Sequence, residues 1–96
     1  MFAKFADKER VNQLVGRGAM LVDMRSPVAF RNGSIDGSIN LPLKSFLNKL
    51  TGMDKKTKLI LFSDNSEDVD VKTGINYAVQ LGFNNLFVSE YKELDS

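Results

Sequence analysis

Four short apolar runs along the chain predict the strands of a buried sheet. Residues 19–24 and 58–63 are apolar almost throughout, which is typical of strands that are covered on both faces. A shorter run, residues 38–42, ends at a proline, and residues 86–88 form the last run. Strands of this kind are typical of parallel sheets, in which helices connect one strand to the next.

Between these runs, apolar residues recur at the spacing of a helix. The pattern covers residues 7–17, 44–50 and 70–81, and Asp7 and Asp70 are the expected capping residues of the first and third helices. The positions that we expect to face the core are Val11, Leu14, Val15, Phe46, Leu47, Leu50, Ile75, Ala78, Val79 and Leu81.

A further helix is signalled by Ser26-Pro27, with serine as the cap and proline at the first helical position, and is expected to run through Phe30. Strands therefore alternate with helices through short connections. This alternation favours the α/β class, with a mostly parallel sheet that carries helices on both faces.

The composition is that of an ordinary globular domain, with 96 residues, 43% of them apolar, and a net charge of +1. Such a length supports one hydrophobic core, so residues 1–96 are expected to form a single domain. The charge balance does not favour a nucleic-acid partner, and no apolar run approaches the roughly 18 residues of a membrane span. The first residues lack the apolar core of a signal peptide, so we expect a cytoplasmic location. The oligomeric state stays open.

Cysteine, histidine and tryptophan are absent from the sequence. A structural zinc site is not expected without Cys or His, and no other metal or cofactor is predicted. Acid–base catalysis would fall to Asp, Glu, Lys or Tyr, whose ordinary pKa values lie well away from neutrality. Most enzyme mechanisms are therefore disfavoured, because no side chain has an ordinary pKa near neutrality.

The loop after the apolar run 58–63 is the main candidate for a functional site, because ligands gather at the carboxyl ends of strands in α/β sheets. Ser63 ends the run. The residues that follow contain four carboxylates and no basic group, and we predict that they form a binding surface: Asp64, Asn65, Ser66, Glu67, Asp68 and Asp70. A serine nucleophile needs a base and an oxyanion hole, and no histidine is present, so we interpret Ser63 as a small polar strand-end residue.

The acidic residues of this loop allow two interpretations that can coexist. Asp68 and Asp70 can cap the following helix and interact favourably with its positive end. There, side-chain carboxylates would occupy the place at which a helix N-terminus binds an anion. The loop can also be a docking surface for a basic protein partner, since its carboxylates produce a concentrated negative field.

A third interpretation is calcium binding, because oxygen-bearing residues alternate like the first ligands of an EF-hand loop (Asp64, Ser66, Asp68 and Asp70). The glycine and glutamate that such a loop needs are replaced by Val69 and Ile75, which argues against it.

Other motifs have simpler interpretations. The basic stretch 55–58 lacks interleaved aromatic residues and is interpreted as a solvated turn. Six phenylalanines lie within or beside apolar segments and are expected in the core: Phe2, Phe5, Phe46, Phe62, Phe83 and Phe87.

The chain resembles the rhodanese-like domain family at Leu21-Val-Asp-Met-Arg25, Phe30, residues 33–37 and Ile39-Asn-Leu-Pro42, in order and in spacing. The resemblance continues through the later apolar strand, loop and helix, so it covers nearly the whole chain. It implies a five-stranded parallel α/β sheet and, as the usual activity of the family, sulfur transfer from a persulfide on a cysteine. It also implies that Asp23 and Arg25 are mostly structural and brace loops beside a buried strand.

This chain departs from the family pattern at the positions that carry the chemistry. Ser63 stands where the family has its cysteine, and Ser66 and Asp68 occupy the Gly and Arg positions of the Cys-x-x-Gly-x-Arg cradle. Ser34 replaces the usual histidine, and residues 89–93 lack the usual Gly-Gly and Trp. A thiolate nucleophile and a ring of donors for an anionic substrate are therefore missing.

The leading hypothesis is a non-catalytic rhodanese-like binding or regulatory module that uses the loop from Ser63 to Asp70 to bind a basic protein. The alternative is an enzyme related to the sulfurtransferases that acts with a partner's cysteine, or a weak hydrolase that depends on Ser63. Restoring the cysteine alone is not expected to restore activity, because a thiolate at this position would form in a negative field.

Overall fold

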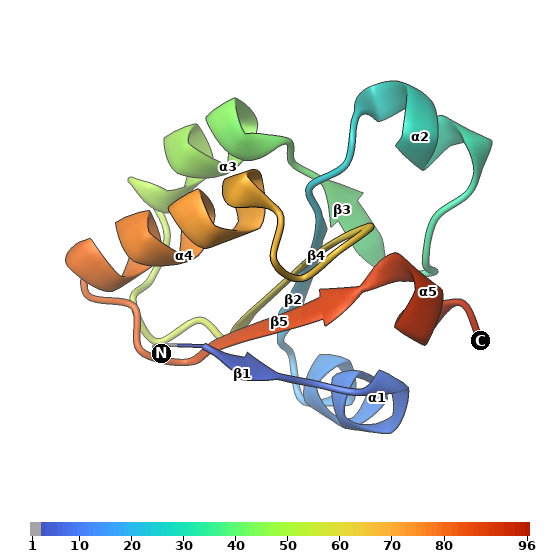
Figure 1. The fold of residues 1–96 in the computed structure, drawn as a ribbon. Coiled ribbons are helices and arrows are strands. Elements are labelled where there is room, and N and C mark those ends of the chain that lie inside the picture. The colour runs from blue at the N-terminus through green and yellow to red at the C-terminus, as the bar shows by residue number, and fades with distance from the viewer. Residues whose placement is uncertain (1–2) are drawn as a thin grey trace.

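The computed structural model describes residues 3–96, which form one five-stranded sheet with helices on both faces (Figure 1). The strands are β1 (Lys4–Phe5), β2 (Met20–Asp23), β3 (Ser38–Asn40), β4 (Leu59–Ser63) and β5 (Leu86–Glu90). Their order across the sheet is β1-β5-β4-β2-β3, and every neighbouring pair is parallel. The expected α/β class and the five-stranded parallel sheet are confirmed.

Five helices connect or follow the strands: α1 (Lys8–Gly16), α2 (Pro27–Asn32), α3 (Leu43–Leu50), α4 (Val69–Gln80) and α5 (Tyr91–Leu94). Figure 1 shows α3 and α4 side by side on one face of the sheet, with α1 and α5 on the other and α2 beyond the β3 edge. The expected caps of α1 and α2 are present, since the Asp7 side chain accepts a hydrogen bond from Arg10 N–H and the Ser26 side chain accepts one from Ala29 N–H.

Two hydrophobic clusters lie on the two faces of the sheet, and the central strands contribute alternate residues to each. Leu59 and Leu61 of β4 pack in the cluster beneath α3 and α4, whereas Ile60 and Phe62 pack in the cluster beneath α1 and α5. Successive side chains of a strand point to opposite faces, so a strand with both faces covered is apolar at every position. All five residues of β4 are buried.

The first strand and the last helix are not evident from the hydrophobic pattern. β1 has only two residues and pairs with β5, where Ala6 N–H donates to Val88 O at 2.9 Å and Ser89 Oγ donates to Ala6 O at 2.7 Å. Long-range hydrogen bonds therefore define this strand. The α5 helix is a single short turn directly after β5.

One of the phenylalanines that we expected in the core is exposed. Phe46, Phe62 and Phe83 are buried, and Phe87 is partly buried, whereas Phe5 is 52% exposed because it lies on the short edge strand. Phe2 lies outside the described residues.

Gly74 lies where α4 packs tightly against core side chains. A Cβ atom at this position would lie 3.2 Å from side-chain carbons of Leu61 and Phe46 and 3.3 Å from Met24 Cε. Glycine in the interior of a helix costs about 1 kcal/mol relative to alanine, so tight packing accounts for its presence here.

We expect Gly74→Val to lower the free energy of unfolding by about 1–3 kcal/mol, because the larger side chain overpacks this contact. Urea denaturation measures the change. Gln80→Val, at an exposed position of the same helix, is the matched control and tests the effect of a β-branched residue alone. Equal stabilities of the two variants would contradict the packing argument.

Candidate functional site

The candidate site lies at the edge of the sheet where the parallel strands end. Ser63 is the last residue of β4 and is 8% exposed, and the loop after it leads into α4. In the β4–β5 register Ser63 is paired with Glu90, the last residue of β5. The parallel pairing therefore brings a carboxylate to the strand beside the position at which the family has its cysteine.

The Glu90 carboxylate closes the loop from the side of β5. The Ser66 backbone N–H donates to Glu90 Oε2 at 3.0 Å, and Ser66 Oγ donates to the same oxygen at 3.1 Å. The next two N–H groups are engaged within the loop, since Glu67 N–H donates to Asn65 Oδ1 at 2.7 Å and Asp68 N–H donates to Asn65 O at 3.1 Å. Three successive backbone donors of the loop thus bind acceptors of the protein itself.

The predicted capping by the loop acids is wrong in its details. The α4 helix begins at Val69, with Asp68 at the N-cap position but without a side-chain capping bond, and Asp70 lies inside the first turn. Asn65 and Glu90 supply the acceptors for the loop, so the Asp68 side chain has no capping role here. The favourable charge of Asp70 near the positive end of the helix remains.

The other loop carboxylates do not gather around a common point. Glu67 Oε1 forms an exposed ion pair with Lys72 Nζ at 2.9 Å, and Asp64 is exposed. Within residues 3–96, no group of three or more Asp or Glu side chains is arranged to hold a metal ion. The EF-hand-like spacing of the loop therefore does not bring its carboxylates together around one point.

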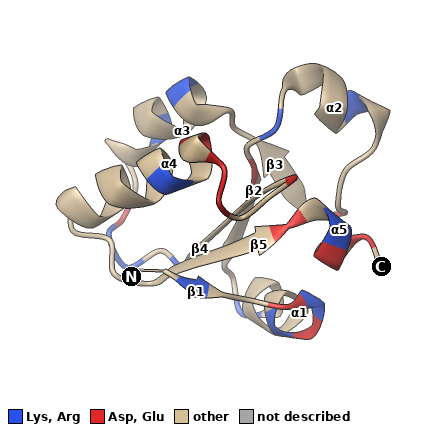
Figure 2. Cartoon of the chain, viewed as in Figure 1, with Lys and Arg blue, Asp and Glu red and all other residues tan. Residues whose placement is uncertain are grey.

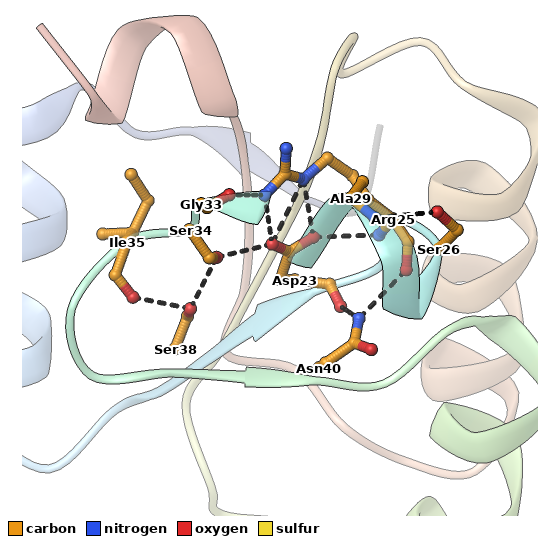
Figure 3. A network of polar contacts seen from close by, with 9 residues as sticks. All are labelled: Asp23, Arg25, Ser26, Ala29, Gly33, Ser34, Ile35, Ser38 and Asn40. Atoms are coloured by element: carbon orange, nitrogen blue, oxygen red, sulfur yellow. Dashed lines mark hydrogen bonds and ion pairs between the residues drawn. The ribbon is translucent and has the colours of Figure 1, made fainter. Parts of the chain in front are cut away.

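A second set of polar contacts surrounds Asp23, which is fully buried at the end of β2 (Figure 3). Arg25 Nη2 donates to Asp23 Oδ2 at 2.8 Å, Arg25 Nε donates to Oδ1 at 3.1 Å, and the Arg25 backbone N–H donates to Oδ1 at 2.9 Å. Ser34 Oγ, at the position of the family's histidine, donates to Asp23 Oδ2 at 2.6 Å. The hydrogen bond to Asp23 raises the pKa of the Arg25 guanidinium above its ordinary value, and the Asp64 charge adds to this effect.

The Asp23–Arg25 pair connects three further segments of the chain. Arg25 Nη2 donates to Gly33 O at 2.7 Å, and the guanidinium carbon lies 4.0 Å from the centroid of the Tyr91 ring. Asn40 Nδ2 donates to the backbone oxygens of both Asp23 and Arg25, at 3.0 and 2.9 Å (Figure 3). The guanidinium is therefore held against the protein by a carboxylate, a carbonyl and an aromatic face, and bracing is the role that this geometry supports.

The structure thus places the predicted residues in two neighbouring groups. Asp23 and Arg25 form a buried ion pair, whereas residues 64–70 form the loop and the first turn of α4. Sequence reasoning missed Glu90 and Tyr91, which reach these groups from β5 and α5. One sequence feature could have identified them, namely the absence of the family's Gly-Gly from residues 89–93. A side chain there occupies space that glycine leaves empty.

The chain belongs to the rhodanese-like domain family, whose model matches residues 7–91. The absence of cysteine is consistent with a catalytically inactive member of that family. A search of curated proteins finds no match.

Solved structures with the same fold include two single-domain sulfurtransferases. Human TSTD1 is 20% identical with a TM-score of 0.74, and the match covers 95% of this chain and 94% of that one. RDL2 from Saccharomyces cerevisiae is 21% identical with a TM-score of 0.74, over 96% of this chain and 88% of that one.

The fold also matches part of a larger protein, the reduced Bacillus anthracis CoADR-RHD, at 19% identity and a TM-score of 0.71. That match covers 94% of this chain and 15% of the other. Identities at this level show a shared fold only. In residues 3–96, no helix combines the length and the apolar character that crossing a membrane requires.

We expect Asp23→Asn to lower the free energy of unfolding by about 3–5 kcal/mol, because it leaves the Arg25 charge without its buried partner. Combining it with Arg25→Met should cost less than the sum of the two single changes, and chemical denaturation of the four proteins measures this coupling. Lys72→Ala is the control, since its exposed pair with Glu67 contributes about 0–1 kcal/mol. Strict additivity at Asp23 and Arg25 would contradict the bracing role.

Proposed function

We propose that this protein is a non-catalytic member of its family that works as a binding or regulatory module, with the loop from Ser63 to Asp70 as its recognition surface. The family's sulfur transfer needs a cysteine to carry the persulfide, and the hydroxyl of Ser63 cannot carry one. The chain contains no cysteine that could take over this role.

The observation that carries the proposal is the pair of hydrogen bonds from Ser66 to the Glu90 carboxylate, at 3.0 and 3.1 Å. A negative group of the protein itself uses a loop donor that an anionic substrate would need. An anion placed about 5 Å from this carboxylate would be repelled by about 3 kcal/mol at an effective dielectric constant of about 20. Glu90 therefore acts against substrate binding both by occupying the donor and by its charge.

The outer surface of the loop supports a docking role. Asp64, Glu67 and Asp70 are exposed, and Asp68 is half-buried, so their charges face solvent. Figure 2 marks these acidic positions along the loop between β4 and α4, with a basic position on α4 itself. That basic residue, Lys72, is paired with Glu67, which leaves a net negative loop. Such a surface attracts a basic protein, and it acts more on the rate and selectivity of association than on the final affinity.

Ser63→Cys is expected to yield a protein without thiosulfate–cyanide sulfurtransferase activity, and with a thiol pKa above the ordinary value for cysteine. Adding Glu90→Gln should lower that pKa by about one unit or more, because it removes the carboxylate of the residue paired with position 63 on β5. The ultraviolet absorbance of the thiolate measures the titration. Adding Glu67→Gln instead is the matched control, since Glu67 is paired with Lys72 and should change the thiol pKa little.

Appreciable turnover by Ser63→Cys alone would overturn this account of the loop. Turnover by the wild-type protein that disappears in Ser63→Ala would instead establish the alternative of a Ser63-dependent enzyme. Turnover that appears only with an added cysteine-containing partner would establish the alternative of a shared active site.

Neutralising the four loop acids, as Asp64→Asn, Glu67→Gln, Asp68→Asn and Asp70→Asn, is expected to abolish the capture of a basic protein from a lysate. Capture by the wild type should weaken as salt increases, because exposed charges are screened. The matched control neutralises four acids away from the loop, as Glu9→Gln, Asp36→Asn, Asp54→Asn and Asp95→Asn, and should retain capture. Equal capture by both variants would falsify docking through the loop.

A further inference from the structure

An apolar pocket of about 240 Å³ lies directly beside the acidic loop. Its walls are Ala3 from the N-terminal segment, Val71 and Ile75 from α4, and Val88 from β5. Ser66 belongs to the lining as well, so the pocket and the Glu90–Ser66 contact share a residue. Lys72 and Asn76 are the exposed members of the lining and lie on α4 at the open side.

The size and lining of this pocket limit what it can hold. Pockets for drug-sized ligands and cofactors have about 300–1,000 Å³ and present several convergent polar groups. This pocket is smaller, and its walls are mostly apolar. One aliphatic or aromatic side chain is the group that fits such a space, in the manner of an anchor residue at a protein interface.

The charges around the pocket indicate the sequence that would surround this anchor. Three carboxylates, those of Glu67, Asp68 and Asp70, lie in the segment between the lining residues Ser66 and Val71. The one basic residue of the lining, Lys72, is neutralised by its contact with Glu67 at 2.9 Å. A segment whose apolar side chain enters the pocket therefore places its flanking residues over a negative surface.

We propose that the pocket formed by Ala3, Val71, Ile75 and Val88 binds a single apolar side chain of a basic peptide segment, whose flanking Lys and Arg residues contact the acidic loop. This inference rests on the proposed docking function and specifies the partner of the same surface. The recognised segment is a leucine-sized residue between basic residues. The basic residues supply attraction and salt dependence, and the apolar residue supplies the affinity that salt does not weaken.

A short synthetic peptide with one leucine between lysines and arginines tests the pocket. It should shift the amide NMR signals of Ser66, Val71, Asn76 and Val88 in the isotope-labelled protein. Replacing its leucine by serine should weaken binding by about tenfold or more, since burial of a leucine side chain is worth roughly 1.5–3 kcal/mol. Equal affinities of the two peptides would overturn the pocket as a site and leave docking through the acids intact.

Two protein variants separate the pocket from the charges. Asn76→Phe places a large side chain at the open side of the pocket and should reduce the affinity for the leucine peptide to that for the serine peptide. Gln80→Phe, an exposed position further along α4 that is not part of the lining, is the matched control and should leave both affinities unchanged. The four-acid variant should bind both peptides more weakly, and its failure to do so would contradict the proposed function rather than the pocket.

Two results would assign the pocket to other occupants and overturn the proposal. Self-association of the free protein that Asn76→Phe abolishes, measured by analytical ultracentrifugation, would assign it to a second copy of this chain. Peptide binding that appears only in Phe2→Ser would assign it to the first residues of the chain itself.

Discussion

All five strands run in the same direction, so their carboxyl ends meet at one edge of the sheet. The polar residues at the ends of β2, β4 and β5 are thereby brought together, although they are far apart in the sequence. Within residues 3–96, every buried side-chain nitrogen or oxygen has a hydrogen-bond partner. Buried polar groups without partners cost about 1–3 kcal/mol each, so this edge is stable only because its groups satisfy one another.

Two of the contacts at this edge involve a carboxylate, and they differ in burial and in consequence. Asp23 is fully buried and holds Arg25, so the pair fixes the loops around β2 and β3. Glu90 is half-buried and holds Ser66, so it fixes the loop after β4. In a sulfurtransferase the loop after the cysteine must present free donors to an anion. Here the Ser66 backbone N–H and hydroxyl already donate to the Glu90 carboxylate.

The same arrangement leaves charged side chains of the loop at the protein surface. Because Glu90 and Asn65 supply the acceptors for the loop, the carboxylates at positions 64, 67 and 70 face solvent, where they can attract a charged partner. The apolar pocket adjoins them because α4 starts at the end of the loop, and Val71 and Ile75 of its first turns line the pocket together with Val88 of β5. Charge and apolar area are thus adjacent, as at interfaces in which an anchor residue is surrounded by polar contacts.

The sequence alone determines the central strands and the helices α1, α3 and α4, because hydrophobic periodicity and caps act over a few residues. The sequence also shows directly that no catalytic cysteine is present. Residues 58–63 are evident as a buried strand for this reason, with Ser63 as its end, and β4 spans Leu59–Ser63. The tertiary structure alone decided that β1 is a strand, that Phe5 is exposed on it, and that Glu90 binds Ser66, 24 positions away. It also decided that Asp68 makes no capping bond, because Asn65 and Glu90 already serve the loop. Such contacts depend on strand order and register, which arise when distant segments pack and leave no periodic trace in the local sequence.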